Sequence, residues 1–125
     1  YVNIYYNTIM KVTLYYANWC GHCKTFKPTW EKLKDEFDSN GIEYNEYEHT
    51  KDKKIIEEEK VEGFPTIRIE NNGEKEDYSG SRDYNDLLGY LKKKNKTMSG
   101  GGMIDYKKLY LKYKKKYLDL KSNIN

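Results

Sequence analysis

The sequence predicts an α/β fold in which helices flank a mixed β-sheet. Segments rich in β-branched and aromatic residues alternate with segments of helical periodicity. An Asn-Gly pair joins two of the strand-like segments and is a strong hairpin signal. Hydrophobic residues make up only 37% of the 125 residues, but aromatic residues make up 15% and can supply a core. The mean hydropathy of −1.07 excludes a membrane-spanning helix.

The first half of the chain predicts a strand, a helix and a second strand. Residues 11–16 are dense in β-branched and aromatic side chains, as in a buried strand. Residues 20–40 predict a helix, because four apolar side chains recur there at helical spacing. These side chains are Phe26, Trp30, Leu33 and Phe37. Gly41 is a helix-stop signal, and residues 42–48 alternate as a second strand.

The second half predicts a short helix, a hairpin and a closing helix. Residues 52–60 form the short charged helix, and residues 66–70 alternate as a third strand. Asn72-Gly73 predicts a tight turn, after which residues 74–78 return antiparallel. The closing helix is expected over residues 82–94, with an apolar face made of Tyr84, Leu87, Leu88 and Leu91. A β-α-β unit followed by a hairpin implies a mixed sheet with helices on both faces.

The chain divides into one domain and a basic C-terminal helix. The domain is expected over residues 1–96, with residues 2–6 as a candidate edge strand. Residues 97–102 form a Gly/Ser linker by composition, and residues 103–125 predict a basic amphipathic helical tail. Residues 1–95 carry 15 basic and 18 acidic side chains, whereas the last 30 carry 8 and 2. This asymmetry indicates either an acidic partner for the tail or a tail that maintains solubility.

A Cys-x-x-Cys motif lies where the first strand ends and the first helix begins. Cys20 falls at the helix N-terminus, where unpaired N–H groups and the helix dipole stabilise a thiolate. Cys23, one turn further, can attack a mixed disulfide at Cys20. His22 adds a donor beside Cys20, and Gly21 allows a tight turn that leaves the substrate unobstructed. The alternative is half of a zinc site, for which His22 and His49 are the remaining ligands of soft or borderline type.

These residues resemble the active site of the thioredoxin superfamily, and Cys-Gly-His-Cys is the form typical of protein disulfide isomerase domains. The resemblance covers about residues 11–94 and implies a thioredoxin-like fold. Pro28 falls where the family has a kink-forming helix proline. The segment 63–66, Gly-Phe-Pro-Thr, resembles the family's cis-proline loop. A proline after Phe64 at the start of a strand also fits a cis peptide bond on physical grounds.

The same resemblance implies roles for residues outside the motif. Trp19, Phe64 and Pro65 are the implied substrate-binding residues, because the proline loop holds extended substrate backbone beside the sulfurs. The segment 78–82, Tyr-Ser-Gly-Ser-Arg, resembles the stretch that leads to the last helix of isomerase domains. Its arginine, Arg82, matches one thought to lower the pKa of the resolving cysteine. We therefore count Arg82 with Cys20, Cys23, His22 and Gly21 as the candidate catalytic set.

Two features depart from the family pattern. The family has a buried acid six residues before the first cysteine, which is thought to accept the proton of the resolving thiol. Leu14 stands there in this chain, so resolution of mixed disulfides is expected to be slow unless another group assists. We expect Arg82 to carry more of this role. The N-terminal β-α unit is also short, since only ten residues precede the first strong strand.

The sequence thus predicts a thiol–disulfide oxidoreductase that acts on protein cysteines, leaning towards oxidase or isomerase chemistry. The redox-active Cys20–Cys23 disulfide suffices for this chemistry, so no metal or organic cofactor is expected. A thioredoxin-like dithiol reductase is the first alternative, because the same pair works in either direction. The alternative of another class is a binding or scaffold module with a vestigial cysteine pair and the tail as its working part.

The tail and the compartment are less constrained by the sequence. Lysines surround a Tyr/Leu stripe, which suits a protein partner, self-association or docking on its own domain, then an anionic membrane surface. Nucleic acid ranks last, because lysine without arginine gives no bidentate base contact. In its Lys, Tyr and Leu composition, the tail resembles tails of proteins from large DNA viruses with AT-rich genomes. With no signal peptide or retention signal visible, we expect the cytoplasm or the virion.

Overall fold

A computed structural model describes residues 10–95, 114, 115 and 118 of the chain. Its elements follow the order β1 (Lys11–Tyr16), α2 (Gly21–Asn40), β2 (Glu43–Glu48), α3 (Lys53–Glu58), β3 (Thr66–Asn71), β4 (Glu74–Asp77) and α4 (Tyr84–Lys94). The expected edge strand at residues 2–6 and the linker at residues 97–102 lie outside the described residues. The three described tail residues are helical, in agreement with the predicted C-terminal helix.

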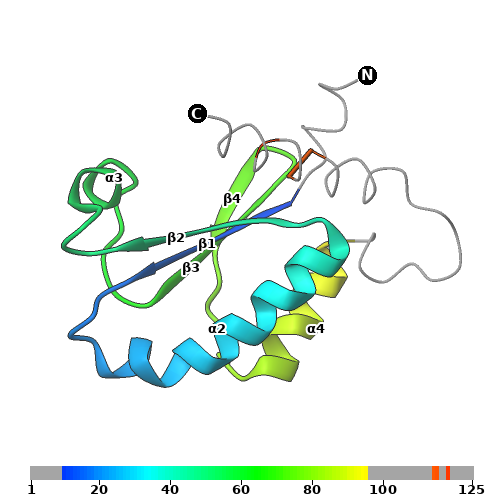
Figure 1. Cartoon of the computed structure of the whole chain (residues 1–125), viewed down its shortest axis with the longest axis horizontal. Helices are drawn as coiled ribbons and strands as arrows, with labels where there is room; N and C mark the ends of the chain where they lie inside the picture. Colours follow the sequence, from blue (N-terminus) through cyan, green and yellow to red (C-terminus); the bar gives the residue numbers. More distant parts are fainter. Residues whose placement is uncertain (1–9, 96–113, 116–117, 119–125) are drawn as a thin grey trace, which may run out of the picture.

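The four strands form one mixed sheet in the order β2-β1-β3-β4 (Figure 1). β1 pairs with β2 in parallel, while the β1–β3 and β3–β4 pairs are antiparallel. The hairpin between β3 and β4 turns at Asn72 (φ 55°) and Gly73 (φ 83°). Two consecutive left-handed residues match the twist of antiparallel strands, which is why Asn-Gly predicted this turn.

Helix α2 carries the face that the sequence predicted. Its buried residues are Cys23, Phe26, Trp30, Leu33 and Phe37. Gly41 ends the helix with φ 68°, and its backbone N–H bonds to the carbonyl of Phe37. Glycine adopts that left-handed conformation without the steric cost of a Cβ, which is why it is favoured at this helix end.

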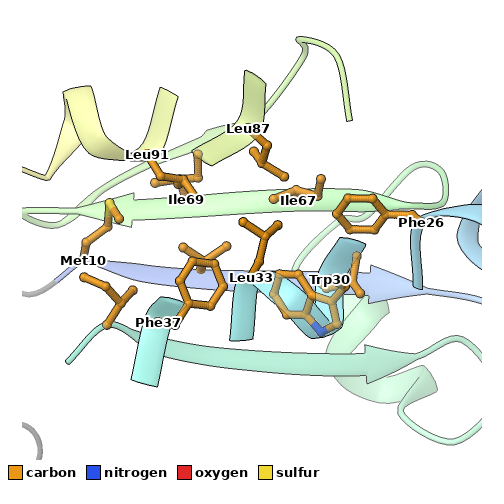
Figure 2. Close-up of a cluster of buried hydrophobic side chains, with 12 residues drawn as sticks. Met10, Phe26, Trp30, Leu33, Phe37, Ile67, Ile69, Leu87 and Leu91 are labelled. Carbon is orange, nitrogen blue, oxygen red and sulfur yellow. The ribbon is translucent and has the colours of Figure 1, made fainter. Parts of the chain in front are cut away.

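The core lies between the sheet and two helices that cover the same face. Figure 2 shows Ile67 and Ile69 of β3 facing side chains from both α2 and α4. Trp30 of α2 is 1% exposed and Leu91 of α4 is 0% exposed. Leu14 belongs to the same cluster, with 5% exposure. The aromatic rings of α2 therefore supply much of the buried apolar area, although only 37% of the residues are hydrophobic.

The opposite face of the sheet is polar and aromatic. Tyr15 stacks on Tyr47 with ring centroids 5.8 Å apart, and the Arg68 guanidinium lies 5.3 Å from the Tyr15 centroid. Arg68 Nη1 also donates to the carbonyl of Glu59, the residue that caps α3, at 2.7 Å. The end of α3 thus lies against this second face, and helices flank both faces as predicted.

All three helices predicted within residues 10–95 begin one or two residues later than the sequence suggested, and the helix expected from residue 20 begins at Gly21. The helix expected from residue 52 begins at Lys53, and the helix expected from residue 82 begins at Tyr84. Asp52 and Asp83 are the residues before each first turn, and Asp83 has an extended backbone (φ −64°, ψ 141°). Neither side chain makes a capping hydrogen bond to the first turn, and Asp52 Oδ2 instead accepts from the backbone N–H of Glu48 at 2.9 Å. The later starts therefore follow from the non-helical backbone of the two aspartates.

Candidate active site

Cys20 directly precedes α2, in the connection from β1 to α2. It is the N-cap of α2 with an extended backbone, φ −85° and ψ 118°. Its Sγ accepts a hydrogen bond from the backbone N–H of Cys23 at 3.3 Å. Each cysteine is 7% exposed, and both are free thiols. The sulfur of Cys20 therefore replaces the oxygen of an ordinary N-cap side chain and meets the unpaired amides of the first turn.

The two thiols are electrostatically unequal. Burial opposes ionisation of Cys20, but hydrogen bonds from the Cys23 thiol and from the amides of Cys23 and His22, with the charge of Arg82, lower the pKa of Cys20. Burial raises the pKa of Cys23 to about 11, and the bond to Cys20 acts in the same direction. Arg82 lowers the pKa of Cys23 as well, but by less. Cys20 is thus the more readily ionised of the two thiols, which makes it the candidate nucleophile.

The loop before β3 lies directly against Cys20. The Phe64–Pro65 peptide bond is cis, in agreement with the expectation from the sequence. Cys20 Sγ lies 3.5 Å from the carbonyl oxygen of Phe64. Thr66 Oγ1 donates to the carbonyl of Gly63 at 2.6 Å, which fixes the loop from both sides of the proline. Phe64 therefore contacts the Cys20 sulfur, and Pro65 follows it in the same loop. Their role in substrate binding stays a prediction.

An aromatic patch formed by Trp19, His49 and Phe64 flanks the loop. Trp19 is 65% exposed, and its ring packs edge-on against His49 at 5.8 Å and Phe64 at 6.0 Å. His49 and Phe64 have centroids 5.1 Å apart. From the sequence, His49 is a candidate only as a zinc ligand. Its position directly after β2, parallel to β1, was the signal that could have placed it beside the cysteines.

The remaining predicted residues surround the cysteines with different exposure. Arg82 is exposed and precedes α4, and it influences both sulfurs through its charge. His22 is exposed in the first turn of α2, and its amide bonds to Cys20. Gly21 has no left-handed φ, and an added Cβ would meet no atom within 4 Å. A tight turn is thus the wrong reason for this glycine; the open space above it is available to a substrate.

A cavity of about 260 Å³ lies on the other side of Cys23. Leu14, Pro65 and Glu46 are among the residues that line it. Glu46 accepts hydrogen bonds from Trp30 Nε1 at 3.0 Å and Lys34 Nζ at 3.0 Å. Glu46 is not among the site residues predicted from the sequence. The sequence placed Glu46 in the predicted strand 42–48, but it did not show that Glu46 and Cys23 line the same cavity.

The described residues contain neither a group of metal-ligating side chains nor a helix that could span a membrane. Within residues 10–95, 114, 115 and 118, no three His, Cys, Asp or Glu side chains are grouped to hold a metal ion. In the same part of the chain, no helix combines the length and apolar character needed to cross a bilayer.

Comparison with known proteins identifies the same architecture. The sequence model of the family described as Thioredoxin matches residues 3–93. The Neurospora crassa protein disulfide-isomerase erp38 is 42% identical over 94 residues, which are 70% of this chain and 26% of that protein. A protein disulfide-isomerase of Datisca glomerata is 36% identical over 104 residues, 73% of this chain and 20% of that protein. The chain thus spans about a fifth to a quarter of these curated relatives.

Among solved structures, the first thioredoxin domain of mouse protein disulfide-isomerase A4 is similar with a TM-score of 0.58 and 27% identity. The match covers 82% of this chain and 73% of that one. The thioredoxin of Fasciola hepatica gives a TM-score of 0.58 at 21% identity, over 74% of this chain and 88% of that one. At that identity the second similarity concerns the fold alone.

Proposed function

The chain belongs to the thioredoxin family, and from this membership we propose that it is a thiol–disulfide oxidoreductase that acts on protein cysteines through Cys20 and Cys23. The observation that carries the proposal is the inequality of the two thiols. The pKa of Cys20 is lowered at the N-terminus of α2, whereas the pKa of Cys23 is raised to about 11. A ready nucleophile beside a protonated second thiol is what a two-step exchange requires.

The reaction exchanges two electrons between the cysteine pair and a client. In the reducing direction, the Cys20 thiolate attacks one sulfur of a client disulfide, and the client's S–S bond breaks. One client sulfur leaves as a thiolate, and the other is held in a mixed disulfide with Cys20. Cys23 then attacks Cys20 Sγ, and the second client sulfur leaves as a thiolate. The client gains two electrons, the pair becomes a disulfide, and each released thiolate takes up a proton.

The client is proposed to be presented by Trp19, Phe64 and Pro65. The carbonyl of Phe64 lies 3.5 Å from Cys20 Sγ, so client backbone that pairs with the loop before Pro65 brings its own cysteine to this sulfur. Trp19 is 65% exposed beside the loop and offers an apolar surface to the client. The open space above Gly21 leaves the approach unobstructed.

The direction of electron flow is proposed to lean towards disulfide donation and isomerisation. Hydrogen bonds from the amides of Cys23 and His22 stabilise the thiolate of Cys20. A stabilised thiolate favours the reduced pair and makes its disulfide a stronger oxidant. The named relatives are protein disulfide-isomerases, which supports this leaning. A thioredoxin-like reductase is the alternative that the reduction potential distinguishes.

Trapping of mixed disulfides tests the proposal. A Cys23→Ser variant is expected to accumulate disulfide-linked complexes with a reporter protein that contains one disulfide, because Cys20 can attack but nothing resolves the product. A Cys20→Ser variant, matched in size and chemistry, is expected to form none. Non-reducing electrophoresis and mass spectrometry of the linked peptide measure both. Equal trapping by the two variants, or none by either, would contradict the proposal.

A second candidate function is that of a binding module whose tail is the interaction element. Two contacts favour it: Lys115 Nζ lies 2.6 Å from Asp38 Oδ1, and Lys114 Nζ lies 3.8 Å from Glu43 Oε1. A tail that contacts acidic side chains of its own domain can exchange them for an acidic protein surface. If Cys20 and Cys23 never form a disulfide at any redox poise, this candidate takes precedence.

A further inference from the structure

The cavity beside Cys23 connects the resolving thiol to a carboxylate on the neighbouring strand. It measures about 260 Å³, and both Cys23 and Glu46 line it. This volume exceeds that of a few water molecules, at roughly 30 Å³ each in the liquid. The cavity therefore has room for a hydrogen-bonded chain of water between the thiol and the carboxylate.

Glu46 reaches this cavity because of the strand register. β1 and β2 run parallel, with Leu14 opposite Glu46, so the two side chains lie on the same face of the sheet. Leu14 is 5% exposed and carries no polar atom in its side chain. The carboxylate thus enters the Cys23 cavity from β2, one strand away from Leu14, where the resemblance led us to expect an acid.

The carboxylate is held in place from the helix side. Trp30, which is 1% exposed, donates from Nε1 to Glu46 Oε2 at 3.0 Å. Lys34 Nζ donates to Glu46 Oε1 at 3.0 Å. The Glu46 side chain remains 40% exposed, so one side meets solvent. A group fixed by a buried ring and open to water can receive a proton from inside and release it to bulk solvent.

We propose that Glu46 accepts the proton of Cys23 through the cavity when Cys23 resolves a mixed disulfide. The proposal rests on the oxidoreductase function proposed above and deepens it. As the proton passes to the carboxylate, the Cys23 sulfur attacks Cys20 Sγ and the Cys20–client bond breaks. The client leaves as a thiolate, and Glu46 then returns its proton to solvent or to the departing thiolate. Glu46 handles only the proton and does not touch the reacting sulfurs, so it is a positioning residue. The bonds between sulfur atoms form and break at the two cysteines.

A proton acceptor is needed because burial raises the pKa of Cys23 to about 11. The charge of Arg82, ahead of α4, lowers that pKa by less than burial raises it. The other titratable groups that line the cavity are Tyr16, Lys24, Lys27 and Glu31. The pKa of Tyr16 is itself raised, first by burial. Glu31 is 54% exposed and bonds to Lys34, so of the two carboxylates lining the cavity Glu46 is the more shielded.

The test follows the second step of exchange as a function of pH. Reduced protein is mixed with excess glutathione disulfide and quenched with acid at set times, and mass spectrometry counts the Cys20–glutathione adduct and the Cys20–Cys23 disulfide. For Glu46→Gln we expect loss of the adduct to slow by about tenfold to a hundredfold at pH 7. Its rate should then rise nearly tenfold per pH unit, because only thiolate formed without help reacts. The wild-type rate should depend less steeply on pH and meet that of the variant in strong base.

Two further variants separate proton transfer from a general loss of charge. Glu31→Gln removes a carboxylate that lines the same cavity and bonds to the same Lys34, and it should keep the wild-type pH profile. Leu14→Glu, added to Glu46→Gln, returns an acid to the opposite strand position and should restore part of the rate. Thermal unfolding confirms that each variant is folded.

Identical pH profiles for the wild type and Glu46→Gln would overturn the proposal, as would an equal effect from Glu31→Gln. These outcomes are distinct from failure of the oxidoreductase function itself. If that function is wrong, no Cys20–glutathione adduct forms in any variant. If only the role of Glu46 is wrong, the adduct forms and resolves at the same rate with and without the carboxylate.

Discussion

Cys20 and Phe64 are 44 residues apart in the chain, yet Cys20 Sγ lies 3.5 Å from the carbonyl oxygen of Phe64. This contact joins the start of α2 to the loop before β3. It places the sulfur next to backbone of the proline loop. In the proposed function, recognition of the client and attack on its disulfide would therefore take place at the same point.

We predict that alkylation separates the two cysteines by pH. Because the pKa of Cys20 is lowered, iodoacetamide should modify Cys20 at a pH below that of an ordinary thiol. Cys23, with a pKa of about 11, should stay unmodified until strongly alkaline pH. The rate of labelling at each residue, followed by peptide mass spectrometry from pH 4 to about 11, measures both. Equal profiles for the two residues would contradict the inequality on which the proposed function depends.

Replacing Arg82 should weaken both ionisations. Its charge lowers the pKa of Cys20 and of Cys23, so Arg82→Ala should raise both values and slow the release of mixed disulfides severalfold. Lys92→Ala is the matched control, because it also removes one exposed positive charge. Lys92 lies in the last turn of α4, whereas Arg82 lies just before the first turn. If Arg82→Ala releases clients at the wild-type rate, its predicted role in resolution is wrong.

The reduction potential of the cysteine pair should lie near about −180 mV, the range of protein disulfide isomerase. Stabilisation of the Cys20 thiolate by the amides of Cys23 and His22 favours the reduced state and raises the potential. Equilibration in glutathione buffers of defined ratio, followed by acid quench and thiol labelling, gives the value. A potential near about −270 mV would favour the reductase alternative.

Burial of Leu33, on the apolar face of α2, should contribute strongly to the free energy of unfolding. Leu33 is 0% exposed within the main cluster, so Leu33→Ala should lower the free energy of unfolding by about 2–5 kcal/mol. Ser39→Ala changes an exposed residue of the same helix and should stay within about 0.5 kcal/mol of wild type. Urea unfolding followed by circular dichroism measures both. A small loss for Leu33→Ala would mean that the cluster tolerates a cavity at this position.

Local sequence patterns were sufficient for most of the fold. Strand β1 was predicted with its bounds, because its burial is continuous and its residues are β-branched or aromatic. The turn at Asn72 and Gly73 followed from the left-handed conformations that this pair accepts. The helices were found, but α4 begins two residues late, because Asp83 is extended before the first turn.

Only part of the candidate site could be predicted from the sequence. Cys20 and the loop at Phe64 could be predicted, because a short motif determines each. His49 and Glu46 could not, because their roles depend on which strands are neighbours and in which register. Of the two reasons given for Gly21, the tight turn finds no support in its ordinary backbone, whereas the open space above it fits an unobstructed approach of the substrate.

The chain's two tryptophans occupy opposite environments, since Trp30 is 1% exposed in the core and Trp19 is 65% exposed beside the cysteines. Intrinsic fluorescence consequently contains two separable signals. Emission from Trp30 should shift to the red when the domain unfolds, whereas emission from the exposed Trp19 should respond to changes beside the cysteines. A Trp19→Phe variant would isolate the first signal, and the difference from the wild type would give the second.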